Sequence, residues 1–249
     1  IAGRNRPKLE SLRRSLSELS SQATDLPILI GDSLDLESLK AIATRTKVVC
    51  TTVGPYLKYG SALVEACVAS GADYCDLTGE APFVRSMIDA HHDQAQRAGR
   101  KIVHCCGFDS IPSDLGCALV QKKALEQYGV PCSKVMLYVR KLKGGASGGT
   151  IASILGFIEM AAKDKQIRRL LGDPYSLNPQ GSWRGPDGRD RTNVSWDSTI
   201  ERWTGPFIMA AINTRVVRRT NLLTGCKYGE DFSYNEVSTA RPGIGGRIR

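Results

Sequence analysis

The sequence is short of the features that mark membrane-spanning, nucleic-acid-binding and metal-binding proteins. Its longest apolar candidate, residues 151–162, contains Glu159 and falls short of the ~18 residues that a membrane-spanning helix needs. Aromatic residues make up only 6% of the chain, and basic residues are scattered among acidic ones, so no nucleic-acid partner is expected. There is no C-x-x-C pair, and the three histidines lack metal-ligand spacing, so no metal is expected either.

Cysteine occurs at eight positions, yet the positions do not favour disulfides. Five of the eight lie in segments predicted to be core strands or helices, where cysteine behaves as a small apolar residue. These five are Cys50, Cys67, Cys75, Cys105 and Cys106. We therefore expect reduced, buried thiols in an intracellular, cytoplasmic protein.

The 249 residues carry a moderately basic formal net charge of +9. This charge fits a protein that handles phosphorylated or acidic small molecules, or one that rests against an anionic membrane. A basic surface without any partner fits equally well. Charge alone therefore leaves the partner open.

The strongest pattern in the chain covers residues 48–80. An apolar, β-branched run stops at Gly54, a helix opens near Ser61 and ends at Gly71, and a second short strand follows at Tyr74–Leu77. This is one strand–helix–strand unit. Ligands of such units bind beyond the carboxyl ends of the strands, so the loop that begins at Gly54 is a candidate ligand site.

Strand and helix alternate through residues 1–130. A strand ends at Asp32, another covers Lys101–Cys106, and the helix that follows is predicted to be capped by Ser113. Four successive repeats predict an α/β protein with a Rossmann-type doubly wound parallel sheet, covered by helices on both faces.

The pattern changes near Pro131, and residues 131–249 are predicted to form a second domain. Alternation over residues 135–139 predicts a half-buried strand of a different sheet. A glycine-rich segment at 144–150 precedes an apolar helix, and residues 173–197 form either an excursion over an active site or a surface loop. A helix over 207–219 ends in three arginines, which we expect to complement its dipole: Arg215, Arg218 and Arg219.

The first residues bear on cofactor choice. Ile1–Asn5 is typical of a strand that runs into a helix. In dinucleotide-binding folds the residue after the second strand contacts the adenosine ribose, and an arginine there suits a 2′-phosphate. Arg4 thus favours NADP over NAD, unless it only caps a strand on a basic surface. Asp32, at the end of the next strand, is placed to contact the adenine amine.

A glycine-rich phosphate-binding turn is not found before Arg4, and the chain opens inside a strand. We expect that the first Rossmann strand is missing from this sequence. In the strand order 3-2-1-4-5-6, residues 1–4 and 48–53 would then flank a gap. A polypeptide with two such unpaired edges is expected to be unstable and to bind NADPH poorly.

Six short motifs carry a resemblance to a known family: AGRN, VGPY, GADYCDLTGE, GFDSIPSDLG, SGGT and WTGPFIMAAIN. Together they resemble the saccharopine-dehydrogenase-like oxidoreductases, in the branch of the trans-acting enoyl reductases of lipid synthesis and their eukaryotic relatives. The resemblance implies an NADP-binding Rossmann domain at residues 1–130. It also implies a second α/β domain with a mixed sheet at 131–249, which serves the substrate or dimerisation and is incomplete at its carboxyl end.

The resemblance also implies site residues. Gly3 and Arg4 fall at the adenosine phosphate. Five residues fall along the ribose and nicotinamide: Thr52, Val53, Gly54, Pro55 and Tyr56. Hydride transfer needs a proton donor beside the acceptor atom, and the candidates are Tyr56 first, then Asp109 and Ser110. Alternatively, Tyr56 packs over its loop, and Asp109 and Ser110 build the turn before a helix.

Two functions of different classes remain. One is an NADP-dependent oxidoreductase that reduces a C=C or C=N bond of a lipid-linked or amino-acid-derived substrate. The other is a non-catalytic relative with the same fold, associated with lipid droplets or a membrane. A small-molecule or lipid-linked ligand is expected in the first case, and a homodimer is compatible with both. An NADPH titration separates the two functions.

Overall fold

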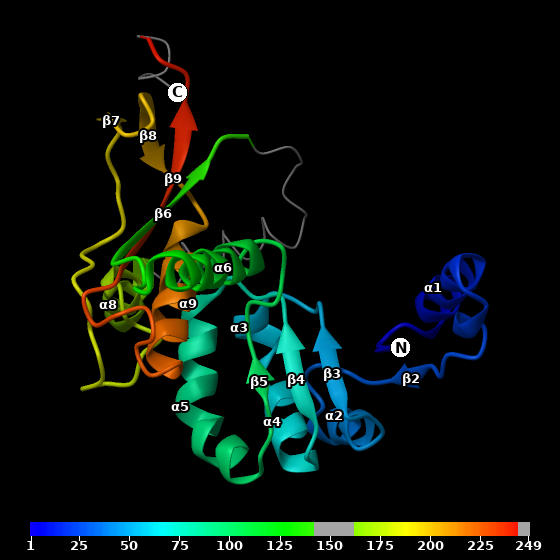
Figure 1. Ribbon diagram of the computed structural model, residues 1–249. Helices are drawn as coiled ribbons and strands as arrows, with labels where there is room; N and C mark the ends of the chain where they lie inside the picture. The colour runs from blue at the N-terminus through cyan, green and yellow to red at the C-terminus, as the bar shows by residue number, and fades with distance from the viewer. Residues whose placement is uncertain (142–161, 244–249) are drawn as a thin grey trace. The chain divides into compact units, whose positions relative to one another are not determined.

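The computed structural model describes residues 1–141 and 162–243. The predicted glycine-rich segment at 144–150, and almost all of the predicted helix at 151–162, lie outside these residues. Figure 1 shows the chain, which divides by its internal contacts into two compact units. Unit 1 comprises Ile1–Asp76 and Ser86–His104, and unit 2 comprises Leu77–Arg85 and Cys105–Arg249. The domain boundary after residue 130 stays a prediction.

Unit 1 contains two parallel sheets. Strand β1 (Ala2–Gly3) pairs with β2 (Leu29–Ile30) in one sheet. The other sheet has the order β3 (Val48–Thr51), β4 (Asp73–Asp76) and β5 (Ile102–Val103). Parallel strands joined by helices confirm the predicted α/β class. Among the described strands, no pairing joins the two sheets.

The helices of unit 1 begin and end where local chemistry directs. They are α1 (Arg6–Leu19), the 3-10 helix η1 (Ser21–Ala23), α2 (Leu36–Ala43), α3 (Tyr56–Tyr59) and α4 (Ser61–Ser70). The Asn5 side chain accepts from the Lys8 amide at 3.0 Å and so caps α1. Gly71, at φ 73°, ends α4 as predicted. Helix α5 (Ala81–Arg97) belongs to both units.

Two cysteines show how strand position changes burial. Cys67, on α4, is buried as expected, and burial raises the pKa of its thiol to about 12. Cys50 is exposed, so its expected burial is wrong. The reason is that β3 is an edge strand of the sheet β3-β4-β5, with no neighbour on its outer side among the described strands.

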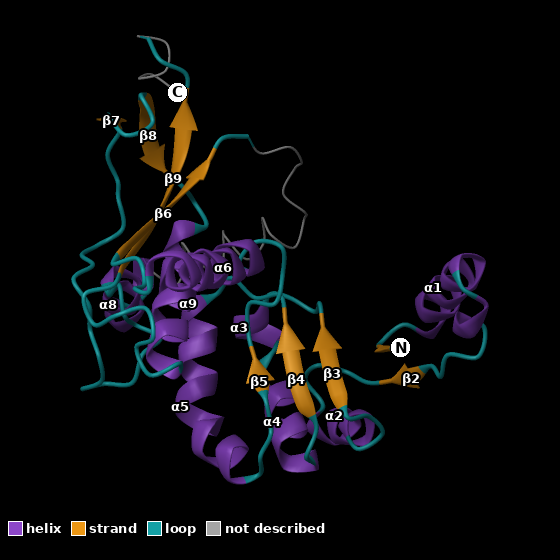
Figure 2. Cartoon of the chain, in the orientation of Figure 1, coloured by secondary structure: helices purple, strands orange, loops and turns teal. Residues whose placement is uncertain are grey.

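Unit 2 is built on a mixed four-stranded sheet, which confirms the sheet type implied by the resemblance (Figure 2). Strands β6 (Lys134–Val139) and β9 (Ser233–Ala240) are parallel. Strand β8 (Arg202–Pro206) runs antiparallel to β9, and β7 (Ser195–Asp197) runs antiparallel to β8. Alternating apolar residues on β6 predicted this strand correctly.

Among the described residues, unit 2 contains the helices α6 (Ile111–Tyr128), α8 (Lys165–Gly172) and α9 (Ala210–Leu223). Helices α6 and α9 pack together, and α9 also contacts β9. A buried cluster lies among them, made of Cys117, Val217, Tyr228, Phe232 and Tyr234.

The start of α6 corrects one prediction. The helix has Ser110 at its N-cap position, not Ser113, and no side chain caps it. Pro112 fits the first helical turn because its fixed φ suits that turn and its missing N–H needs no partner there. Ser113 is instead buried within the helix, and its hydroxyl accepts a hydrogen bond from Asn213 at 3.1 Å.

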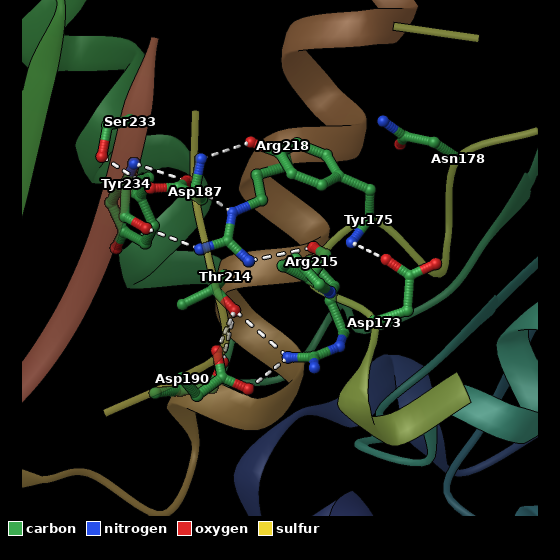
Figure 3. A network of polar contacts seen from close by, with 12 residues as sticks. Asp173, Tyr175, Asn178, Asp187, Asp190, Thr214, Arg215, Arg218, Ser233 and Tyr234 are labelled. Carbon is green, nitrogen blue, oxygen red and sulfur yellow. Dashed lines mark hydrogen bonds and ion pairs between the residues drawn. The ribbon is translucent and has the colours of Figure 1, made fainter. Parts of the chain in front are cut away.

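The arginines of α9 correct another prediction. The helix continues to Leu223, so Arg215 and Arg218 do not lie at its end, and they are only 1% and 0% exposed. The Arg218 Nε donates to Asp187 at 2.7 Å, and the Arg215 Nη1 donates to Asp190 at 2.7 Å (Figure 3). These charges do not complement the dipole; they fasten the loop 173–197 to α9.

The Arg218 pair is expected to dominate the stability of unit 2. The Arg218 guanidinium also donates to the carbonyls of Pro174 and Tyr234, at 2.9 and 3.0 Å. An alanine side chain can form none of these hydrogen bonds. Arg218→Ala leaves the Asp187 carboxylate buried without its cation, which should lower the free energy of unfolding by ~3–5 kcal/mol in urea titrations. The control Arg14→Ala, on the exposed surface of α1, should change it by less than ~0.5 kcal/mol. A loss below about 1 kcal/mol for Arg218→Ala would contradict the buried pair.

Candidate active site at the strand ends of unit 1

The two parallel sheets of unit 1 each direct the carboxyl ends of their strands to one edge. In the sheet β1-β2, Arg4 follows β1 and Asp32 follows β2. In the sheet β3-β4-β5, the predicted loop Thr52–Tyr56 follows β3, Asp76 ends β4 and His104 follows β5. Because ligands of doubly wound sheets bind at this edge, these residues form the candidate site.

The end of the sheet β1-β2 brings three predicted cofactor residues together. The Gly3 carbonyl accepts from the Gly31 amide at 3.2 Å, which sets the two strand ends side by side. The Arg4 Nη1 lies 4.0 Å from the Asp32 Oδ2, and the Arg4 side chain is 69% exposed. An exposed ion pair at this distance contributes little to stability, so the Arg4 guanidinium can turn toward a second anion.

The loop after β3 presents its backbone to solvent. Thr52, Val53 and Gly54 are exposed, and the Val53 amide donates to the Thr51 hydroxyl at 3.2 Å. A Cβ placed on Gly54 would meet the Tyr56 ring at 3.4 Å, so the loop and the ring are in contact. An exposed, glycine-containing loop at a strand end can receive a ligand close to its backbone.

Tyr56 ends this loop and is only 6% exposed. Its hydroxyl donates to the Thr51 carbonyl at 3.2 Å, as expected if the ring packs over the loop. The proposed role of Tyr56 as proton donor stays a prediction, and it would require the hydroxyl to exchange this carbonyl for a substrate.

Three buried side chains at the same edge, those of Tyr74, Asp76 and His104, form a trio that the sequence analysis did not predict. The Asp76 Oδ2 lies 2.6 Å from the His104 Nδ1 and accepts from the Tyr74 hydroxyl at 3.0 Å. The His104 and Asp76 side chains are 7% and 0% exposed, and the His104 ring meets Tyr74 edge-on. Burial, and then the charge of Asp76, raise the pKa of the Tyr74 hydroxyl. The trio can hold an imidazole in one orientation.

Sequence reasoning missed His104 because it considered histidines only as metal ligands. A signal was present: a histidine directly after an apolar strand, matched by an aspartate at the end of the preceding strand. The trio gives Asp76 two specific partners, His104 and Tyr74.

Asp109 and Ser110 belong to unit 2, whereas Tyr56 belongs to unit 1. They adjoin a buried polar network centred on Asn213. The Asn213 Nδ2 donates to the Asp109 carbonyl at 2.8 Å, and its Oδ1 accepts from the Ser110 hydroxyl at 2.8 Å. The same Nδ2 lies 3.0 Å from the Glu236 carboxylate. This network ties the motif GFDSIPSDLG to α9 and β9, which is a structural role; the catalytic role remains a prediction.

No cluster of His, Cys, Asp and Glu side chains suited to a metal ion occurs in residues 1–141 and 162–243. Within the same part of the chain, the helices are too short or too polar to cross a membrane.

Comparison with known proteins finds relatives in mycobacteria. A protein of Mycobacterium tuberculosis, provisionally named a trans-acting enoyl reductase, is 43% identical over 246 residues, which cover 95% of this chain and 57% of the relative. The trans-acting enoyl reductase of Mycobacterium ulcerans is 38% identical over 248 residues, covering 95% and 58%. The Mycobacterium leprae protein of the same name is 37% identical over 244 residues, again covering 95% and 58%. The chain thus spans less than two thirds of the length of these relatives.

Other comparisons add little. No protein-family model matches the chain. A solved Bacillus subtilis structure, titled provisionally as an oxidoreductase, aligns over 92% of this chain and 55% of its own, at 12% identity and a TM-score of 0.37. A likeness this slight carries no argument about the fold or the function.

A glycine substitution tests whether the loop after β3 meets a cofactor. Gly54→Val should abolish NADPH binding, measured by fluorescence titration, because the branched side chain blocks the approach of a ligand to the backbone. The fold should persist, since Gly54 does not need a positive φ and its added Cβ meets the Tyr56 ring at an ordinary distance. The control Gly116→Val, on α6, should leave NADPH affinity unchanged. Near-normal affinity in Gly54→Val would show that the loop faces away from the cofactor.

Proposed function

We propose that this protein is an NADP-dependent oxidoreductase of the saccharopine-dehydrogenase-like kind, which reduces a C=C bond of a lipid-linked substrate. The observation that carries the proposal is the 43% identity, across 95% of the chain, to a protein named for enoyl reduction. An enoyl group contains a C=C bond, which favours that bond over a C=N bond. The proposal extends to an intracellular setting, peripheral contact with a membrane or lipid droplet, and a homodimer.

The strand ends of unit 1 fit the cofactor that this reaction needs. Arg4 is exposed at the place where a 2′-phosphate is read, and the backbone of Thr52–Gly54 is exposed where the ribose and nicotinamide would lie. The nicotinamide, when bound, supplies a hydride to one carbon of the double bond, and the protein supplies position and a proton. Arg4 would hold the phosphate, and the loop after β3 would orient the reacting ring.

The proton for the second carbon is assigned to Tyr56 first, with Asp109 and Ser110 as the other candidates. Tyr56 begins α3, directly after the loop proposed to hold the nicotinamide. Its hydroxyl already has an O–H bond to donate, and the Thr51 carbonyl that accepts it is a neutral partner that a substrate can replace.

One observation favours the alternative, a non-catalytic relative that associates with lipid droplets or a membrane. The hydroxyls of Tyr56 and Ser110 both donate to acceptors of the protein itself. A binding protein would retain these bonds, whereas a reductase must break at least one of them during turnover.

Arg4→Ala tests cofactor choice. A charge-assisted contact with the 2′-phosphate is worth roughly 1.5–3 kcal/mol, so NADPH affinity should fall by about one to two decades more than NADH affinity. Calorimetric titration with each cofactor measures the difference. The control Arg14→Ala, which removes an exposed arginine within α1, should affect neither. Equal losses for both cofactors in Arg4→Ala would remove the NADP assignment.

Tyr56→Phe tests the proton donor. Loss of a general acid should lower kcat for NADPH-dependent reduction of an enoyl thioester by about 10²–10⁴-fold, with NADPH affinity unchanged. It should also remove the basic limb of the pH–rate profile, which a packing role would not do. The control Tyr59→Phe, on the same short helix, should retain kcat. An unchanged kcat in Tyr56→Phe would transfer the role to another residue.

A further inference from the structure

Unit 2 contains an open cavity of about 550 Å³ that no part of the proposed reduction uses. It is lined by α8 and by the loop that follows this helix. Five cationic side chains line it against a single carboxylate, Asp173; the cations are Lys165, Arg168, Arg169, Arg184 and Arg189.

In the loop after α8, two acidic side chains point toward α9, whereas two basic side chains line the cavity. Asp187 and Asp190 turn toward α9, where they pair with Arg218 and Arg215 (Figure 3). Arg184 and Arg189 of the same loop line the cavity instead. The two carboxylates nearest to Arg189 in sequence are therefore paired with arginines of α9, and they do not neutralise the charge of the cavity.

The cavity keeps an excess of positive charge. The Arg184 guanidinium donates two hydrogen bonds to the Asp173 carboxylate, at 2.6 and 3.2 Å. Burial raises the pKa of Asp173, but the bonds from Arg184 and from the Tyr175 amide outweigh it, so the pKa lies below its usual value and the carboxylate is charged. Of the other four cations, three have exposed side chains with which none of the described residues forms an ion pair: Lys165, Arg169 and Arg189.

The cations of α8 also repel one another. Lys165, Arg168 and Arg169 are spaced three and four residues apart, so they share one face of the helix. Like charges at this spacing destabilise a helix. A bound anion would convert this repulsion into attraction.

We propose that this cavity binds the diphosphate group of a small-molecule ligand. Guanidinium groups match pairs of phosphate oxygens with forked hydrogen bonds, and four arginines line the site. The volume lies within the range of about 300–1,000 Å³ usual for small-molecule pockets, and a concave site suits such a ligand better than a flat membrane. Coenzyme A and dinucleotides both carry this group. The inference concerns unit 2 alone and is independent of the proposed reduction.

Calorimetric titrations of the protein at low salt test the proposal, with inorganic pyrophosphate, coenzyme A and NADPH as probes. Arg169→Gln combined with Arg189→Gln should weaken pyrophosphate binding by about tenfold or more, because two charge-assisted contacts are lost. The matched control, Arg14→Gln with Arg45→Gln, removes two exposed arginines of unit 1 and should leave the affinity within about twofold. Thermal melts should show that both double variants fold, since all four side chains are exposed.

The other probes identify the source of the diphosphate. A parallel loss for coenzyme A with NADPH unchanged would assign the site to an acyl carrier of that type, and a parallel loss for NADPH would assign it to a dinucleotide. Equal pyrophosphate affinity in the two double variants, or none in the unsubstituted protein, would overturn the proposal. A third outcome would also overturn the proposal, in favour of a membrane surface. In that case the unsubstituted protein binds phosphatidylserine vesicles but not pyrophosphate, and the double variant Arg169→Gln with Arg189→Gln loses the vesicle binding.

Discussion

Parallel hydrogen bonding between β3, β4 and β5 is the constraint on which the candidate active site depends. The register sets Thr51 opposite Asp76, and β5 continues the same direction. Each strand must therefore release its chain at the same edge of the sheet. The exposed loop after β3 and the buried pair of Asp76 and His104 meet at that edge for this reason, although 28 residues separate the pair in sequence.

A different constraint organises unit 2. Two ion pairs between buried guanidinium groups and carboxylates hold the irregular loop 173–197 against α9. The desolvation of Arg218 is offset by further hydrogen bonds from its guanidinium to the carbonyls of Pro174 and Tyr234. Because Asp187 and Asp190 pair with Arg218 and Arg215, neither carboxylate lines the cavity beside α8, where Arg189 lies. The interactions that order the loop thus leave the cavity with an excess of basic side chains.

Local sequence predicted the elements whose causes are local. The β-branched run of β3, the glycine that ends α4 and the alternation along β6 each depend on neighbours within a few residues, and the structure confirms them. The mixed sheet of unit 2 came from the resemblance alone, because the pairing of β6 with β9 joins segments about a hundred residues apart.

The failures have the opposite origin. Arg218 finds its partner 31 residues upstream, so a bunch of arginines near the predicted end of a helix looked like a dipole effect. Cys50 was expected inside because its strand is apolar, but sheet order places that strand at an edge. The role of His104 became visible only in the structure, where the pairing of β4 with β5 brings it next to Asp76. Long-range pairing, which residue patterns do not encode, decided each of these cases.

Amide hydrogen exchange of this protein, with and without saturating NADPH, tests most directly whether the strand ends of unit 1 hold the cofactor. The account predicts slower exchange at residues 3–5, 31–33 and 52–57, with the β7–β8 hairpin of unit 2 unchanged. Protection confined to unit 2, or none at the loop after β3 under saturating NADPH, would contradict it.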